Sequence, residues 1–119
     1  MLVQAVQAAI PGVHIDYNNG RDSSVIQLSQ AEADLANGDC ILVVGAHDSV
    51  AASSIVARAH AQNVPVIAYD RLIQSRDLDY YVSFDGVKVG QLQGQYIAEH
   101  YQRYQRGGRV DTVMISGSQ

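Results

Sequence analysis

Residues 64–71, VPVIAYDR, form a short apolar run that ends on two opposite charges, Asp70 and Arg71. A run without a polar face is typical of a strand that is buried on both sides of a parallel sheet. Ligands of open α/β sheets bind outside the carboxyl ends of the strands, so the charged pair marks a candidate site. The carboxylate can accept two hydroxyl hydrogen bonds and the guanidinium can donate from a planar fork, which suits the vicinal hydroxyls of a sugar. An ion pair that faces water explains the same two residues equally well.

Helical and strand patterns alternate along the rest of the chain. Ser23 or Asp22 can cap one helix, which Gly38 ends, and Asp48 can cap the next helix, which Asn63 ends. Alternation of this kind predicts a parallel sheet with helices on both faces, that is, a doubly wound, three-layer α/β/α fold. Besides the helix between Asp48 and Asn63, we expect helices over residues 1–10, 22–37 and 87–106, and strands over residues 13–17, 41–46, 64–69, 80–84 and 110–116.

Composition excludes several classes of protein. With 8 basic and 12 acidic residues in 119, the chain lacks the basic stripe that a nucleic-acid-binding protein needs. A single cysteine rules out an intrachain disulfide. The apolar runs are far shorter than the roughly 20 residues of a membrane-spanning helix, and no signal peptide is visible in residues 1–10. Both ends fall inside secondary-structure patterns, so we expect a fragment of a longer protein.

Sequence motifs of enzymes are missing. The glycines do not form a dinucleotide or phosphate loop, the four histidines lack metal-ligand spacing, and no nucleophile elbow is present. We therefore predict no enzyme activity, cofactor or metal. His47 and Asp48 follow a predicted strand and could form an acid–base pair, although capping by Asp48 is the simpler explanation. Together with Asp70, Arg71 and Asp85 they predict a polar mouth at the strand ends, which indicates binding rather than reaction.

Longer segments point to a known family. The sequences VPVIAYDRLI and DLDYYVSFDGVKVGQLQG resemble type I periplasmic sugar-binding proteins of ABC transporters, most of all the D-xylose-binding and multiple-sugar-binding branch. The segment NNGRDSSVIQLSQAEADLANGDCILVV is similar to the family's second strand, helix and third strand. The closing RVDTVMISGSQ resembles the passage into a second lobe. The resemblance covers essentially the whole chain.

The resemblance implies a periplasmic, two-lobed protein that closes on a monosaccharide such as xylose or glucose and then docks on an ABC permease. Residues 1–109 would be a partial N-terminal lobe, and residues 110–119 would be the strand that begins the second lobe. Asp70 and Arg71 match the family's ligand-contacting pair, whereas His47 and Asp48 match a loop that lines the cleft. Asp85 matches a position where helix capping explains an aspartate as well as ligand contact does.

Departures from the family pattern lead to further expectations. The family's first strand and second lobe have no counterpart here, so we expect this chain to bind sugar weakly or not at all alone. The missing strand would leave unpaired sheet edges, which predicts a strand-exchanged homodimer or another close oligomer. The same fold also serves as the effector core of lactose-repressor-type regulators and as a sensory ligand-binding domain. The sequence leaves both functions open as alternatives.

Overall fold

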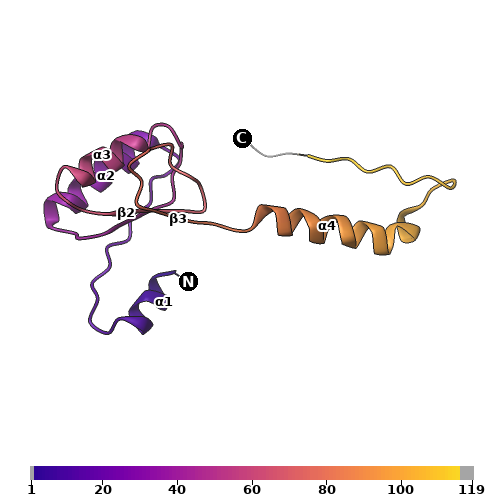
Figure 1. Cartoon of the computed structure of the whole chain (residues 1–119), viewed down its shortest axis with the longest axis horizontal. Helices are drawn as coiled ribbons and strands as arrows, with labels where there is room; N and C mark the ends of the chain where they lie inside the picture. The colour runs from indigo at the N-terminus through magenta and orange to yellow at the C-terminus, as the bar shows by residue number, and fades with distance from the viewer. Residues whose placement is uncertain (1, 116–119) are drawn as a thin grey trace. The chain divides into compact units, whose positions relative to one another are not determined.

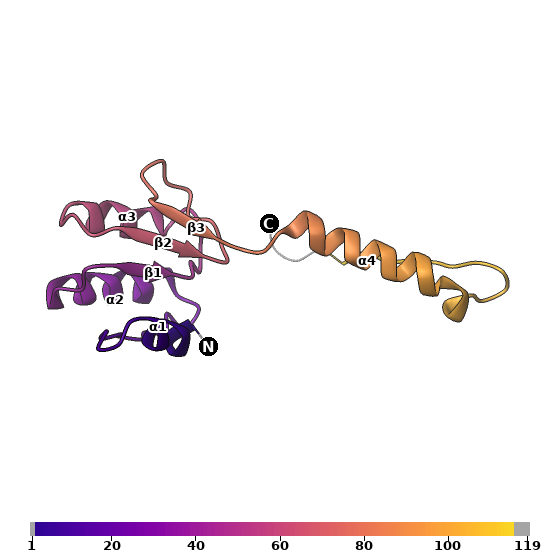
Figure 2. The same ribbon diagram turned by 60° about the horizontal axis from the view of Figure 1, so that its bottom comes forward.

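A parallel sheet orders the first part of the chain in the computed structural model, which describes residues 2–115 (Figure 1). Contacts divide the chain into two units, Met1–Ser83 and Phe84–Gln119, and we describe each by itself. Among the described residues of the first unit, three strands lie side by side in the order β1-β2-β3 (Figure 2). The elements of this unit are α1 (Leu2–Ala9), α2 (Ser24–Asn37), β1 (Leu42–Val44), α3 (Ser53–His60), β2 (Val66–Tyr69) and β3 (Tyr80–Val82).

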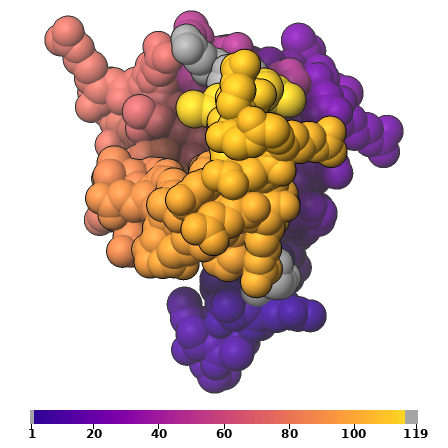
Figure 3. Space-filling model, turned by 90° about the vertical axis from the view of Figure 1, so that its right-hand side faces the viewer, coloured from indigo at the N-terminus to yellow at the C-terminus, as the bar shows by residue number. Residues whose placement is uncertain are grey.

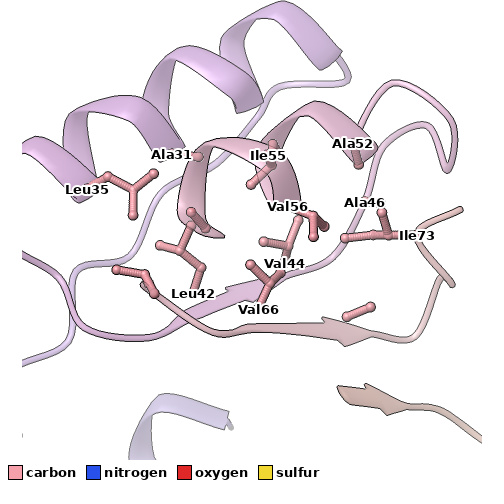
Figure 4. Close-up of a cluster of buried hydrophobic side chains, with 13 residues drawn as sticks. Ala31, Leu35, Leu42, Val44, Ala46, Ala52, Ile55, Val56, Val66 and Ile73 are labelled. Carbon is pink, nitrogen blue, oxygen red and sulfur yellow. The ribbon is translucent and has the colours of Figure 1, made fainter. Parts of the chain in front are cut away.

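The core lies between this sheet and two helices. In the register of β1 and β2, Leu42 stands beside Val66 and Val44 stands beside Ala68, and all four side chains are buried. Figure 4 shows α2 and α3 on the same side of these strands, with side chains of both helices directed at them. Burial of a valine or leucine side chain stabilises a fold by about 1.5–3 kcal/mol. The buried residues are Ala31, Leu35, Leu42, Val44, Ala46, Ala52, Ile55, Val56, Ala59, Val64, Val66, Ala68 and Ile73.

The opposite face of the sheet is more open than the sequence predicts. Ile67 is half-buried, and Val43 and Tyr69 are exposed, because α2 and α3 pack on the other face. Strand β3 is exposed along its length. The central place of β2 is nevertheless confirmed, because it pairs in parallel with β1 on one side and with β3 on the other.

Local capping signals place α2 where the sequence predicts it. The Ser23 hydroxyl accepts a hydrogen bond of 3.3 Å from the Ile26 N–H at the start of the helix. Gly38 ends the helix with a left-handed φ of 94°, a conformation that glycine adopts at no steric cost. The buried face of α3 is confirmed as well, but this helix begins only at Ser53, and its N-cap residue is Ala52.

Two predicted strands are absent from the described residues. Residues 13–17 have the alternating pattern of a strand but form no ladder, and residues 110–115 likewise have no strand conformation. A strand needs a neighbour to satisfy its N–H and C=O groups, and alternation of side chains does not supply one. Ser116, the last residue of the second predicted strand, lies outside the described residues, as does the end of the predicted segment 110–119. The predicted boundary after residue 109 stays a prediction.

The second unit contains one long helix, α4 (Gly86–His100), followed by a short 3-10 helix, η1 (Tyr101–Tyr104). Gly107 and Gly108 both have positive φ and turn the chain between Arg106 and Arg109, which exchange two backbone hydrogen bonds. No residue of α4 is buried, and the surface of this unit is drawn in orange and yellow in Figure 3. In the part of the chain that the structure describes, no helix combines the length and apolar character needed to cross a membrane.

Candidate functional site

A glutamine from α2 holds the exit of β1. The Gln27 side-chain amide donates a 2.9 Å hydrogen bond to the Gly45 carbonyl, and its oxygen accepts a 3.1 Å hydrogen bond from the His47 N–H. One half-buried side chain therefore fixes the backbone on both sides of Ala46. The chain leaves the strand here along a defined path and carries His47 and Asp48 to the carboxyl edge of the sheet.

Arg71 connects the exit of β2 to that of β1. Its guanidinium Nη1 donates to the backbone carbonyl of His47, which lies at the neighbouring strand end. The prediction that these strand ends meet at one edge is confirmed for His47 and Arg71. This contact uses one of the five N–H donors of the guanidinium and leaves the others for further partners.

Asp48 acts as a cap. Its Oδ1 accepts hydrogen bonds from the Val50 and Ala51 N–H groups at 2.9 and 2.7 Å. These backbone donors, with smaller contributions from His47 and Arg71, hold the pKa of the Asp48 carboxyl below its ordinary value. The capping interpretation is confirmed, with the correction that Asp48 caps the turn at residues 49–52 rather than the first turn of α3.

Asp70 has an unusual backbone conformation. Its φ is +68°, and the Arg71 N–H donates a 2.8 Å hydrogen bond to the carbonyl of Tyr69, two residues back. An i-to-i+2 hydrogen bond around a central residue of positive φ defines the rare, strained form of the γ-turn. Strain of this kind costs on the order of 1–3 kcal/mol and persists only where the surroundings enforce it. Asp70 is exposed, at the carboxyl end of β2.

Asp85 belongs to the second unit and caps α4. Its Oδ1 accepts a 2.9 Å hydrogen bond from the Lys88 N–H. The capping interpretation of Asp85 is confirmed, and its membership of the polar mouth stays a prediction. Of the predicted residues, the structure thus places His47, Asp48, Asp70 and Arg71 at the strand exits of one unit.

Sequence reasoning missed two residues near this edge. Gln27 is one of them, and its signal in the sequence is a polar residue between the apolar Ile26 and Leu28 of α2. The other is Asp22, which follows Arg21 in a turn where both residues have positive φ, 54° and 48° respectively. Asp22 brings its Oδ1 to 4.0 Å from Nδ1 of His47. The turn sequence before α2 predicts a loop there but not its approach to His47.

A second polar contact lies at the amino end of β2. Nε2 of His60 lies 2.8 Å from Oδ2 of Asp79, and the same oxygen accepts a 2.8 Å hydrogen bond from the Val66 N–H. The His60 hydrogen bond is the main cause of a lowered pKa at Asp79, and the Val66 N–H adds to it. These contacts connect the end of α3, the start of β2 and the segment that leads into β3. Within residues 2–115, no group of three or more potential metal ligands comes together.

Comparisons with known proteins agree on one family. Residues 2–119 match the family described as the periplasmic binding protein domain. The chain is 42% identical over 118 residues to the multiple sugar-binding periplasmic receptor ChvE of Rhizobium radiobacter, covering 98% of this chain and 33% of that protein. It is 41% identical over 85 residues to the D-xylose-binding periplasmic protein of Haemophilus influenzae, covering 71% of this chain and 25% of that protein.

Solved structures show the same fold. An ABC transporter solute-binding protein from Clostridium phytofermentans with bound β-D-glucose matches with a TM-score of 0.73 and 32% identity, over 87% of this chain and 32% of that one. A carbohydrate transporter solute-binding protein from Chloroflexus aurantiacus, in complex with D-glucose, matches with a TM-score of 0.73 and 37% identity, over 82% of this chain and 28% of that one. The chain thus spans between a quarter and a third of the length of these relatives.

Proposed function

Because this chain belongs to the periplasmic binding protein domain family, we propose that it is part of the sugar-binding component of an ABC transport system. The observation that carries this proposal is the pair Asp70 and Arg71 at the exit of the central strand. Two of its relatives are named for multiple sugars and for D-xylose, and two similar structures hold glucose. The proposed ligand is therefore a monosaccharide such as xylose or glucose.

In the proposed recognition, Asp70 supplies hydrogen-bond acceptors and Arg71 supplies hydrogen-bond donors. The exposed carboxylate of Asp70 accepts hydrogen bonds from sugar hydroxyls, whereas the free N–H donors of Arg71 approach hydroxyl oxygens. His47 and Asp48 line the same rim through their backbone. The contact between Arg71 and the His47 carbonyl supports this assignment, because it holds the guanidinium over the strand exits before any ligand arrives.

The proposed mechanism is binding followed by closure, without a chemical step. Sugar enters between two lobes, Asp70 and Arg71 fix its hydroxyls, and hinge closure buries it. The ionised carboxylate of Asp48 is engaged by two backbone N–H groups, which argues against a role as a general base. A complete protein of this kind would work in the periplasm and deliver its closed form to a membrane permease.

The 119-residue chain alone is proposed to bind sugar weakly or not at all. Its candidate contacts lie on one exposed rim, and exposed polar contacts contribute little to affinity. Calorimetry of the chain with xylose and with glucose tests this point. Saturable binding at micromolar sugar would contradict it.

A strand-exchanged homodimer of the chain is also proposed. Among the described residues β1 pairs along one edge only, and Ile41 and Val43 beside the free edge are exposed. Val113, Met114 and Ile115 are apolar, exposed and without a ladder partner within the described residues, so the segment 110–115 could supply a strand. Sedimentation equilibrium tests the dimer, and Val113→Pro should convert it to a monomer. A monomer at every concentration of the unaltered chain would exclude the dimer.

A thermal-shift screen of the complete protein against pentoses and hexoses tests the function itself. A ligand at a thousand times its dissociation constant stabilises a protein by about 4 kcal/mol, which is a readily measured rise in melting temperature. A shift with xylose, glucose or galactose would support the sugar-binding role and identify the substrate. A protein that responds to none of these sugars would contradict it.

A further inference from the structure

The γ-turn at Asp70 is held by an unusual set of contacts. The Asp70 N–H donates a 2.8 Å hydrogen bond to the Val82 carbonyl and so extends the ladder between β2 and β3 by one residue. Immediately afterwards the chain reverses, because the Arg71 N–H donates back to the Tyr69 carbonyl. Asp70 thus begins as part of the sheet and ends as part of a strained turn.

Two hydroxyl groups converge on the Asp70 carbonyl oxygen. Tyr81 donates from its phenol at 3.1 Å, and Ser83 donates from Oγ at 3.0 Å. Both residues come from β3 or its exit and not from the strand that carries Asp70. A carbonyl oxygen has two lone pairs, so the two donors saturate it.

The same arrangement leaves the carboxylate of Asp70 without a hydrogen-bond partner among the described residues. Among the described residues, no group donates a hydrogen bond to the Asp70 carboxylate, whereas the backbone N–H and C=O of this residue are fully engaged. A positive φ points the side chain along a different direction from that of an ordinary strand residue. The contacts therefore fix the direction of the Cα–Cβ bond of Asp70 and leave its carboxylate oxygens unoccupied.

We propose that Tyr81 and Ser83 are positioning residues for the Asp70 carboxylate, and that their two hydroxyls hold the strained turn in its binding geometry. This inference rests on the proposed sugar-binding function. A strained backbone persists only where its surroundings enforce it, and exposed strand ends offer little packing to do so. The two hydroxyls supply the constraint by hydrogen bonding. Removal of both hydroxyls should release the turn and turn the carboxylate away from the sugar.

The test uses the complete protein and five variants. Tyr81→Phe and Ser83→Ala each remove one hydroxyl, and the double variant removes both. Tyr80→Phe is the matched control, because Tyr80 is the neighbouring exposed tyrosine and its hydroxyl makes no hydrogen bond among the described residues. Ser83→Thr keeps a hydroxyl at the same position and tests for rescue.

Isothermal titration calorimetry with D-glucose and D-xylose gives the affinities, and thermal melting shows that each variant is folded. The double variant should bind about tenfold more weakly, because sugar binding must then re-form the strained turn without the two hydrogen bonds. Its melting temperature should stay near that of the unaltered protein, because release of the strain offsets the loss of the hydrogen bonds. Tyr80→Phe and Ser83→Thr should bind like the unaltered protein. Unchanged affinity in the double variant, or an equal loss in Tyr80→Phe, would overturn the proposal.

A crystal structure of the double variant separates this inference from the proposed function. We expect Asp70 to leave the positive-φ region once both hydroxyls are gone, whether or not a sugar binds. Retention of the γ-turn would refute the positioning role even if sugar binding is established. Absence of binding by the unaltered protein to either sugar would instead contradict the proposed function, and the conformation of Asp70 would then decide whether the hydroxyls hold the turn.

Discussion

The guanidinium of Arg71 donates a hydrogen bond to the backbone carbonyl of His47, and this contact joins the exits of β2 and β1. The acceptor is a main-chain atom, so it persists whatever side chain stands at position 47. Gln27 holds the same loop from the other side, through the Gly45 carbonyl and the His47 N–H. The rim of the candidate site is therefore ordered by side chains from α2 and from the end of β2.

Replacement of Arg71 should weaken sugar binding by the complete protein. Arg71→Ala removes the ligand-facing donors together with the contact to His47, and a hydrogen bond to a charged group contributes about 1.5–3 kcal/mol, so the dissociation constant should rise at least tenfold. Arg71→Lys should recover only part of this loss, because an ammonium lacks the planar fork. Calorimetry with D-glucose and D-xylose measures both variants. Arg76→Ala, at an exposed arginine of the following connection, is the control and should bind normally. Equal affinities for Arg71→Ala and the unaltered protein would show that the site is assigned wrongly.

Ser23→Ala should destabilise the first unit through α2. The Ser23 hydroxyl accepts from the Ile26 N–H, and loss of such a cap costs about 0.5–2 kcal/mol. Urea unfolding followed by circular dichroism gives the free energy of unfolding. Ser29→Ala, at an exposed position in the same helix, should be neutral or slightly stabilising because alanine favours helix. A larger loss from Ser29→Ala than from Ser23→Ala would contradict the capping role.

Ile55→Ala should open a cavity beneath α3. Ile55 is 1% exposed and points into the core between α2, α3 and the sheet (Figure 4). Truncation of a buried isoleucine to alanine costs about 2–5 kcal/mol, which is a large part of the stability of a small domain. Val25→Ala, at a 78% exposed position of α2, removes apolar atoms without making a cavity and should cost little. The same urea unfolding experiment compares the two variants, and similar losses would argue against this core.

Asp79→Asn should alter the acid side of the stability profile. The pKa of Asp79 is lowered in the folded protein by the His60 hydrogen bond and by the Val66 N–H. A lowered folded-state pKa means that the ionised carboxylate stabilises the fold above about pH 4, and that this contribution is lost as the pH falls through the folded-state pKa. The variant should therefore melt below the unaltered protein at pH 7, and the difference should shrink below about pH 4.

Thermal melting measured between about pH 2.5 and pH 7, in steps of about half a pH unit, records this profile. Asp77→Asn is the matched control, because Asp77 lies in the same connection and its carboxylate makes no hydrogen bond among the described residues. A constant difference between Asp79→Asn and the unaltered protein across this range would exclude the linkage.

Local signals in the sequence predict much of the first unit. Ser23 and Gly38 delimit α2 because a cap acts through its own side chain or its own φ, whatever the rest of the fold does. The apolar run before Asp70 identifies the central strand for a similar reason, because few environments accept a segment without a polar face. Residues 13–17 fail as a strand although they alternate correctly, because a strand also requires a partner, which alternation does not encode.

Only part of the candidate site can be predicted from the sequence. Asp70 and Arg71 are predictable as a charged pair at a strand end, but the strained turn centred on Asp70 is not, since aspartate tolerates positive φ without requiring it. The partner of Arg71 is a backbone carbonyl, which every residue possesses. Tyr81 and Ser83 alternate in a strand and predict only a common side of the sheet, not a common acceptor.

The β1-α3-β2 unit also bears on how this chain folds. Leu42 pairs with Val66 across a single intervening helix, and Ile55 and Val56 of that helix belong to the same buried cluster as these strands (Figure 4). The parallel loop between β2 and β3 is shorter, but β3 is exposed along its length, so among the described residues closure of the β1-α3-β2 loop buries more apolar surface for the chain entropy that it loses. We expect it to form the folding nucleus. Substitutions at Val66 should then slow folding, whereas substitutions in the late-docking β3 should mainly speed unfolding.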